Sequence, residues 1–180
     1  TTLMDVDENT EVVVVAIDDV DIVFANIMYP TYAQMDGENN YVIGQAYRNS
    51  VINIGIDESV VWEISESIVS FDSQKVGNST LLSGGTILCA SPKMRKVLEI
   101  VPETSSIIFS HTPNFTPMFS VRTDAGNTIV VDADEDHNGL NSRIYEIDSS
   151  QDVIREWGLG KINMPTGMCV LEGGDWLISC

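Results

Sequence analysis

The sequence is short of basic residues, and that shortage argues against one class of partner. Only 9 of the 180 residues are lysine or arginine, against 27 aspartates and glutamates, so the net charge is −18 at pH 7. A chain this acidic repels phosphate backbones, which argues against binding to nucleic acid or docking on anionic lipid. Cation binding, a cationic partner, or solubility in a salty medium would each account for the acidity.

Long apolar runs, cysteine and histidine are also scarce. No stretch of 18 apolar residues predicts a membrane span. Cys89, Cys169 and Cys180 are an odd number without metal-ligand spacing, so at most one internal disulfide can form. The sequence has no Ser-His-Asp order, Cys-His pair, P-loop or dinucleotide fingerprint, and its two histidines are His111 and His137. These gaps favour a non-catalytic protein, with His111 as the weak catalytic candidate.

The signals that are present are those of short β-strands. Apolar, β-branched runs of about five residues lie between turns rich in glycine or aspartate, and no window shows a long helical spacing of apolar residues. Residues 11–17 and 22–26 read as a hairpin with an acidic turn. We therefore predict an all-β fold in a single domain.

These strands recur as a repeat of roughly 40–50 residues, which is typical of a β-propeller. The clearest copy consists of residues 126–132, 143–148 and 153–158. Weaker copies of the same three segments occur twice earlier, at residues 40–44, 50–54 and 60–64, and at residues 78–83, 96–100 and 107–110. The sequence predicts about four blades of four antiparallel strands.

The repeat boundaries leave the completeness of the ring open. Three copies span about 27–64, 65–113 and 114–160, and a fourth, 161–180, contains only two strands. The hairpin at 11–26 resembles the last two strands of a blade, so strands from both ends of the chain could close a four-bladed ring and leave no open sheet edge. The alternatives are a fragment of a larger propeller, or half of a propeller that a second copy completes.

Four short motifs resemble the blades of arylsulfotransferase-like, NHL and quinoprotein-type propellers. They are GNTIV at 126–130, SRIYEID at 142–148, VVWE at 60–63 and the entry strand MPTGM at 164–168. The resemblance implies a propeller over about residues 27–179. In the sulfotransferase type it also implies a histidine nucleophile at the central funnel, but neither histidine lies in a motif that matches residue by residue.

The quinoprotein resemblance implies a cofactor held by tryptophans, basic residues and calcium. Trp62, Trp157 and Trp176 instead occupy strand positions where packing between blades accounts for them. Apart from calcium, we therefore expect no cofactor.

The third copy is interrupted by an acidic insertion that matches the start of a calcium loop. Side-chain oxygens of Asp134, Asp136 and Asn138 occupy positions 1, 3 and 5, and a glycine follows at position 6. The carbonyl of Leu140 and the hydroxyl of Ser142 would be positions 7 and 9. The bidentate glutamate at position 12 is absent, so we expect modest affinity. A solvated acidic hairpin loop is the alternative.

Three functions from different classes are open at this point. The first is a non-catalytic binding or scaffolding module, secreted or at the cell surface, with a protein, small-molecule or glycan ligand at a propeller face. The glycosylation patterns at Asn78 and Asn114 support that location. The second is an arylsulfotransferase-like or other propeller enzyme, or a fragment of one. The third is a structural subunit that forms homo-oligomers through blade edges.

The enzyme hypothesis makes one concrete demand on the structure. It requires His111 in the central funnel beside a basic residue, and the basic residues available are Arg48, Arg122 and Arg143.

Overall fold

A computed structural model describes most of the chain. The described residues are 13–17, 20–24, 27, 30–36, 38–45, 49–57, 59–65, 67–69, 78–132, 142–163, 165, 167–171 and 175–179. In these ranges the regular structure consists of sixteen β-strands and no helix, and hence no helix long enough to cross a membrane. The predicted all-β fold is confirmed.

Three antiparallel sheets of four strands form the body of the molecule. Blade 1 contains β3 (Pro30–Met35), β4 (Tyr41–Gln45), β5 (Ser50–Ile54) and β6 (Val60–Ile64). Blade 2 contains β7 (Ser79–Leu81), β8 (Ile87–Ser91), β9 (Lys96–Val101) and β10 (Ser106–His111). Blade 3 contains β11 (Pro117–Arg122), β12 (Thr128–Asp132), β13 (Ile144–Ile147) and β14 (Val153–Trp157). Within each blade the strands pair in chain order.

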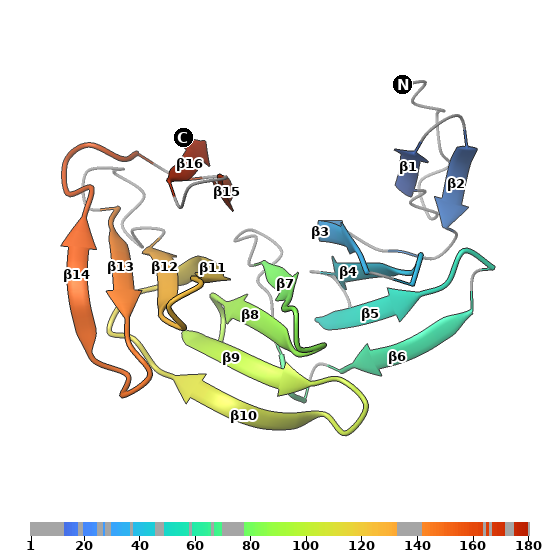
Figure 1. The fold of residues 1–180 in the computed structure, drawn as a ribbon, viewed down its shortest axis with the longest axis horizontal. Helices are drawn as coiled ribbons and strands as arrows, with labels where there is room; N and C mark the ends of the chain where they lie inside the picture. The colour runs from blue at the N-terminus through green and yellow to red at the C-terminus, as the bar shows by residue number, and fades with distance from the viewer. Residues whose placement is uncertain are drawn as a thin grey trace.

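Two hairpins flank the three blades. They are β1 (Val13–Ile17) with β2 (Val20–Phe24), and β15 (Gly167–Val170) with β16 (Trp176–Ser179). Each forms its own two-stranded sheet. Figure 1 shows them at opposite ends of an open arc, so in the described part of the chain the first hairpin does not complete the blade of the second. In this structure the terminal hairpins therefore form two separate sheets, and three full blades with these flanking hairpins are consistent with the predicted number of about four blades.

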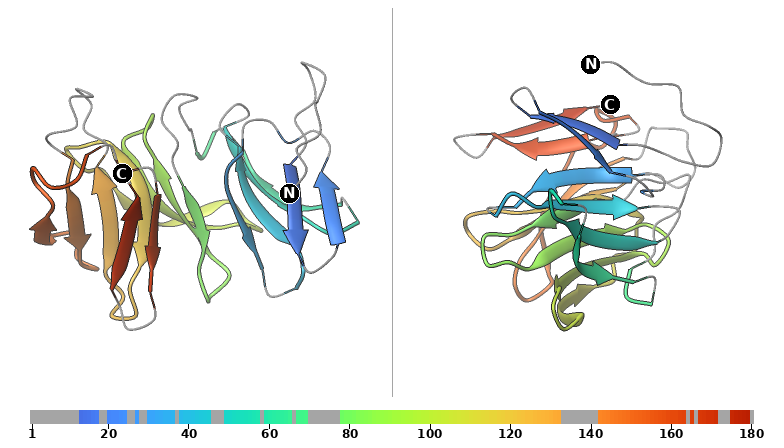
Figure 2. Two further views of the ribbon diagram at one scale, coloured as in Figure 1. Left: turned by 90° about the horizontal axis from the view of Figure 1, so that it is seen from above. Right: turned by 90° about the vertical axis from the view of Figure 1, so that its right-hand side faces the viewer.

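The arc has the arrangement of propeller blades. Strands β3, β7, β11 and β15 lie on its concave side, and β6, β10 and β14 lie on its outer side (Figure 1). Seen from above, the sheets stand next to one another along the arc (Figure 2). This stacking covers both faces of the middle strands, which explains why most of their residues are buried.

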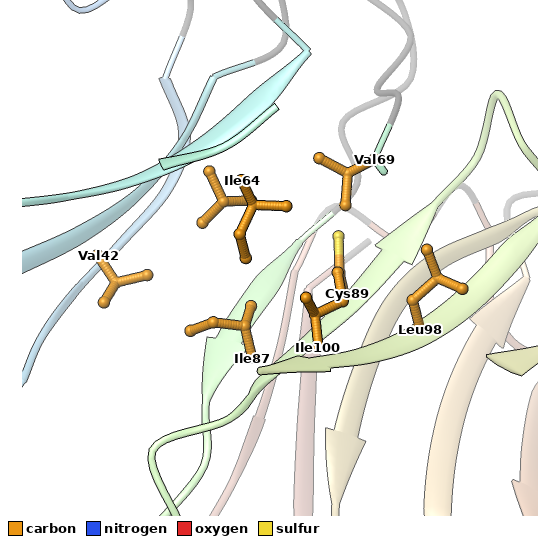
Figure 3. Packing of buried hydrophobic residues seen from close by; sticks show 8 residues of the cluster. Val42, Ile64, Val69, Ile87, Cys89, Leu98 and Ile100 are labelled. Atoms are coloured by element: carbon orange, nitrogen blue, oxygen red, sulfur yellow. The ribbon is translucent and has the colours of Figure 1, made fainter. Parts of the chain in front are cut away.

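Alternation along the middle strands divides the core between neighbouring blades. In β8, Ile87 and Cys89 pack toward blade 1, whereas Leu88 packs toward blade 3. Figure 3 shows the interface of blades 1 and 2, where Val42 and Ile64 meet Ile87 and its neighbours. All residues of β4, β5, β8 and β12 are buried. Because side chains alternate with a period of two, each strand serves two interfaces at once.

The tryptophans lie at these interfaces, as the repeat predicted. Trp62 packs against the cluster between blades 1 and 2. Trp157 of blade 3 and Trp176 of the last hairpin meet edge to face, with ring centroids 4.9 Å apart. That geometry is favourable for aromatic pairs. The packing prediction for these tryptophans is confirmed.

The glycine of the GNTIV motif has a clear conformational role. Gly126 closes the turn between β11 and β12 with a φ of +84°, and its N–H donates to the carbonyl of Thr123 at 2.9 Å. Residues with a Cβ rarely adopt this φ, so glycine suits this turn. The glycine of the GNTIV motif is therefore explained by the backbone conformation of the β11–β12 turn.

Candidate functional site

The inner strands of the arc line a groove in the described part of the chain. This central groove has a volume of about 760 Å³ and touches β3, β7, β11 and β15, which are the first strands of four successive sheets. Its lining is Tyr32, Asn78, Thr80, Leu81, Leu82, Ser83, Gly84, Thr86, Glu99, Val121, Arg122, Thr123, Asp124, Met168 and Cys169. A volume of this size is typical of ligand sites in proteins.

An ion pair between blades 2 and 3 forms one wall of the central groove. The Arg122 guanidinium donates to Glu99 Oε2 at 2.5 Å and to Thr128 Oγ1 at 2.8 Å, and it lies 5.3 Å from the centroid of the Phe109 ring. The other Glu99 oxygen accepts from the Thr86 hydroxyl at 2.7 Å. The Glu99 carboxylate and the Arg122 guanidinium therefore both have hydrogen-bond partners within the protein. This arrangement is consistent with a structural role for the ion pair.

Blades 1 and 2 are joined at the groove by a glutamine side chain. Gln34 Oε1 accepts from the Leu81 N–H at 3.0 Å, and Gln34 Nε2 donates to the Leu81 carbonyl at 3.5 Å. The Tyr32 hydroxyl also donates to Gln34 Oε1, at 3.2 Å. Burial raises the pKa of Tyr32, against a smaller opposing effect of its hydrogen bond with Thr80. The Tyr32 phenol therefore stays neutral and serves as a hydrogen-bonding group.

His111 lines neither this groove nor the second groove described below. It is the last residue of β10, the outermost strand of blade 2, where it pairs with Val97. Burial lowers the pKa of His111, and a hydrogen bond with the Gln151 side chain opposes that shift. The structure thus places this catalytic candidate on an outer strand, whereas the enzyme hypothesis needs it at the centre.

The basic residues named with His111 are also dispersed. Arg122 is held by Glu99, as described. Arg143 forms an ion pair with Glu156 at 2.5 Å, and the two side chains are 32% and 41% exposed. Arg48 lies outside the described residues. The described residues therefore bring together no histidine–arginine site.

The predicted calcium loop falls mostly on residues that the structure does not describe. Asp134, Asp136, Asn138 and Leu140 lie outside the described ranges, and Ser142 lies inside them. Ser142 is fully buried, and its Oγ has no hydrogen-bond partner among the described residues. In the described part of the chain, no group of three or more acidic, histidine or cysteine side chains could hold a metal ion.

The state of the cysteines and the exposure of the two predicted glycosylation sites are relevant to the predicted secreted or cell-surface location. Cys89 and Cys169 are both free thiols, one buried and one exposed. Burial raises the pKa of the Cys89 thiol far above its usual range, which makes that thiol unreactive. Asn78 is only 3% exposed, so a glycan there is incompatible with this fold. Asn114 is exposed.

Sequence reasoning did not identify Gln34 or Glu99 as residues of a groove, whereas Arg122 was among the basic residues named for the central funnel. One local signal was available for Glu99, because it is a carboxylate in the apolar run of β9 (KVLEIV). Gln34 had no such signal, since its partner is a backbone group 47 residues away.

Solved structures of propeller proteins resemble this arc. A protein of unknown function from Bacteroides caccae is 15% identical with a TM-score of 0.63, over 88% of this chain and 58% of that one. A virginiamycin B lyase from Staphylococcus aureus with quinupristin is 15% identical with a TM-score of 0.62, over 95% and 53%. The WD40 β-propeller domain of Doa1 is 12% identical with a TM-score of 0.66, over 88% and 49%.

These similarities establish the fold at a coarse level. No family model and no curated protein matches the sequence. The chain spans roughly half of the length of the solved structures it resembles. At such low identity a shared fold does not imply a shared activity. The predicted resemblance to propeller blades is confirmed, and this chain is a β-propeller module.

Proposed function

We propose that this chain is a non-catalytic binding module that takes a segment of a protein partner along the central groove. The observation that carries the proposal is the state of the ionisable groups there. Glu99 and Arg122 satisfy each other and neighbouring hydroxyls, and the raised pKa of Tyr32 keeps its phenol neutral. General acid–base catalysis needs a titratable group free to exchange a proton with substrate. A polar groove whose arginine is already paired with a glutamate is better suited to binding.

A bulky residue placed in the groove tests this proposal. A Cβ added at Gly84 would meet no atom within 4 Å, so Gly84→Trp should fold normally and obstruct the groove. Peptides selected from a display library on the wild-type protein should bind Gly84→Trp at least about tenfold more weakly by calorimetry, a loss of about 1.4 kcal/mol. Ser150→Trp, in an exposed turn of blade 3, is the matched control. Equal binding to both variants would reject the proposal.

The proposal also includes a secreted or cell-surface location, a calcium ion at the loop at 134–142, and a type of propeller. The exposed Asn114 and the net charge of −18 support a secreted or cell-surface protein. The buried, unpartnered Oγ of Ser142 supports an oxygen ligand at the edge of the proposed calcium loop. Among propellers, the motifs at 126–130 and 142–148 support a type related to arylsulfotransferase-like, NHL or quinoprotein blades.

A second candidate function, assembly through blade edges, is favoured by the outer strands. Each of the three outer strands exposes two consecutive β-branched residues, with exposed fractions of 46–58%, namely Val60 and Val61, Ile107 and Ile108, and Val153 and Ile154. Unpaired apolar edge strands favour pairing with another chain. Wild-type protein should then sediment as a concentration-dependent oligomer, and Ile108→Lys with Ile154→Lys should dissociate it. A constant monomer mass would reject this candidate.

A further inference from the structure

A second groove lies beside the central groove, and its chemistry differs. This acidic groove has a volume of about 700 Å³ and is bordered by the β3–β4 turn, β6 and the β7–β8 turn. Its lining is Asp36, Glu38, Asn40, Asn53, Val61, Trp62, Leu81, Leu82, Ser83, Gly85 and Glu103. The two grooves share Leu81, Leu82 and Ser83, so the β7–β8 hairpin forms the ridge between them.

The described residues that line this groove carry negative charge and no positive charge. Asp36, Glu38 and Glu103 contribute three carboxylates, and no lysine, arginine or histidine among the described residues lines the groove. The central groove differs, because its Glu99 is paired with Arg122. Low-dielectric walls with charge of one sign concentrate counter-ions and charged ligands.

The carboxylate of Asp36, which lines the groove, is held in place by hydrogen bonds. It accepts hydrogen bonds from the N–H groups of Glu38 at 2.8 Å and Asn40 at 2.9 Å, and from the side-chain amides of Asn40 at 3.1 Å and Asn53 at 2.9 Å. Burial alone would raise the pKa of Asp36, but these hydrogen bonds together lower it. The carboxylate is therefore preorganised and ionised at neutral pH.

The side-chain amide of Asn53, which is bonded to the Asp36 carboxylate, has an oxygen that accepts no hydrogen bond from the described residues. Asn53 is 4% exposed, it lines the groove, and its Nδ2 is committed to Asp36. Its Oδ1 is buried and has no hydrogen-bond partner among the described residues. A buried acceptor without a partner is unfavourable, so a ligand that brings a donor near it would be favoured.

The remaining walls indicate what kind of cation fits. Val61, Trp62, Leu81 and Leu82 give the groove an apolar and aromatic side. A volume of about 700 Å³ exceeds that of a bare ion, and no cluster of three metal-binding side chains occurs in the described ranges. Lysine and arginine combine an apolar stem with a cationic head that donates hydrogen bonds, and both heads interact favourably with tryptophan.

We propose that the acidic groove binds a lysine- or arginine-bearing segment of a partner protein. The cationic head lies among Asp36, Glu38 and Glu103, and the apolar stem packs on the side that contains Trp62. This inference does not depend on the ligand of the central groove, because none of the three carboxylates lines that groove.

A blocked peptide of alternating glycine and lysine is the probe, titrated into the 180-residue protein by calorimetry. We expect the double variant Glu38→Gln with Glu103→Gln to bind it at least about tenfold more weakly, because attraction between charges a few ångströms apart at a protein surface exceeds that amount. Both residues are exposed, and neither side chain supports Asp36, so the variant should fold. The same peptide with acetylated lysines has lost its positive charges. It should bind the wild-type protein at least about tenfold more weakly than the unmodified peptide does.

The matched control removes two carboxylates that do not line the groove. Asp152→Asn with Asp175→Asn changes the net charge equally, at exposed positions on blade 3 and the last hairpin, and should lower the affinity less than about twofold because distant charges are screened. Gly84→Trp, which obstructs the central groove, should leave lysine-peptide binding unchanged. Equal losses in the two double variants, equal binding of the acetylated peptide, or no binding to the wild type would each overturn the proposal.

Discussion

The side-chain amide of Asn78 pairs with the backbone of Ser120 as a neighbouring strand would. The Ser120 N–H donates to Asn78 Oδ1 at 2.8 Å, and Asn78 Nδ2 donates to the Ser120 carbonyl at 3.1 Å. Both residues are buried, at 3% and 0% exposed. Gln34 makes the corresponding pair of bonds to Leu81 between blades 1 and 2. Amide side chains therefore join adjacent blades on the concave side of the arc.

Removal of this link should destabilise the protein. Asn78→Ala would leave the N–H and carbonyl of Ser120 buried without these partners, and we expect a loss of about 1–3 kcal/mol in the free energy of unfolding. Urea denaturation would measure it. Asn114→Ala, at an exposed asparagine, should change stability by less than about 0.5 kcal/mol. Similar effects of the two substitutions would show that the Asn78 amide contributes nothing specific.

The ion pair of Glu99 and Arg122 should be energetically coupled. Its side chains are 19% and 17% exposed, so solvent screens it only partly. Alanine substitutions in a double-mutant cycle should give a coupling energy of about 1–2 kcal/mol from chemical denaturation. The Arg143–Glu156 pair, with side chains 32% and 41% exposed, should give less than about 1 kcal/mol. A larger coupling energy for Arg143–Glu156 than for Glu99–Arg122 would contradict the structural role assigned to the less exposed pair.

Asp36 should make stability depend on acidity. Its pKa is lower in the folded chain than the ordinary value of 3.8, so the folded state binds fewer protons than the unfolded state near that pH. The resulting stabilisation is present above the unfolded pKa and is lost as pH falls through the folded pKa. Asp36→Asn should therefore flatten the acid limb of a plot of unfolding free energy against pH. An unchanged acid limb would show that the hydrogen bonds to Asp36 are not coupled to folding.

Calcium should raise the melting temperature if the loop at 134–142 binds it. Binding to the folded state stabilises it by mass action, and each kcal/mol corresponds to about 2–4 °C for a chain of this size. Calorimetric melts with increasing calcium would measure the shift. Asp134→Asn with Asp136→Asn should abolish it, whereas Asp124→Asn, in the turn between β11 and β12, should not. A melting temperature that calcium leaves unchanged would rule out the site.

The sequence by itself determined the secondary structure and the kind of fold. Strand positions follow from alternation and from turn residues such as Gly126, which act over a few residues. The tryptophan positions were also predictable, because large aromatic side chains on the strands of stacked blades are stabilised by packing against a neighbouring sheet. Repetition of these local signals was sufficient to indicate a propeller.

The tertiary structure alone decided the shape and the sites. Whether the terminal hairpins share a sheet depends on contacts between distant segments, and the structure keeps them apart at the two ends of an open arc. Asn78 reads locally as a glycosylation pattern, yet its amide is committed to a backbone 42 residues away. The two grooves likewise combine residues from several blades. Local patterns carry no information on such long-range pairing, because it arises only when the blades stack.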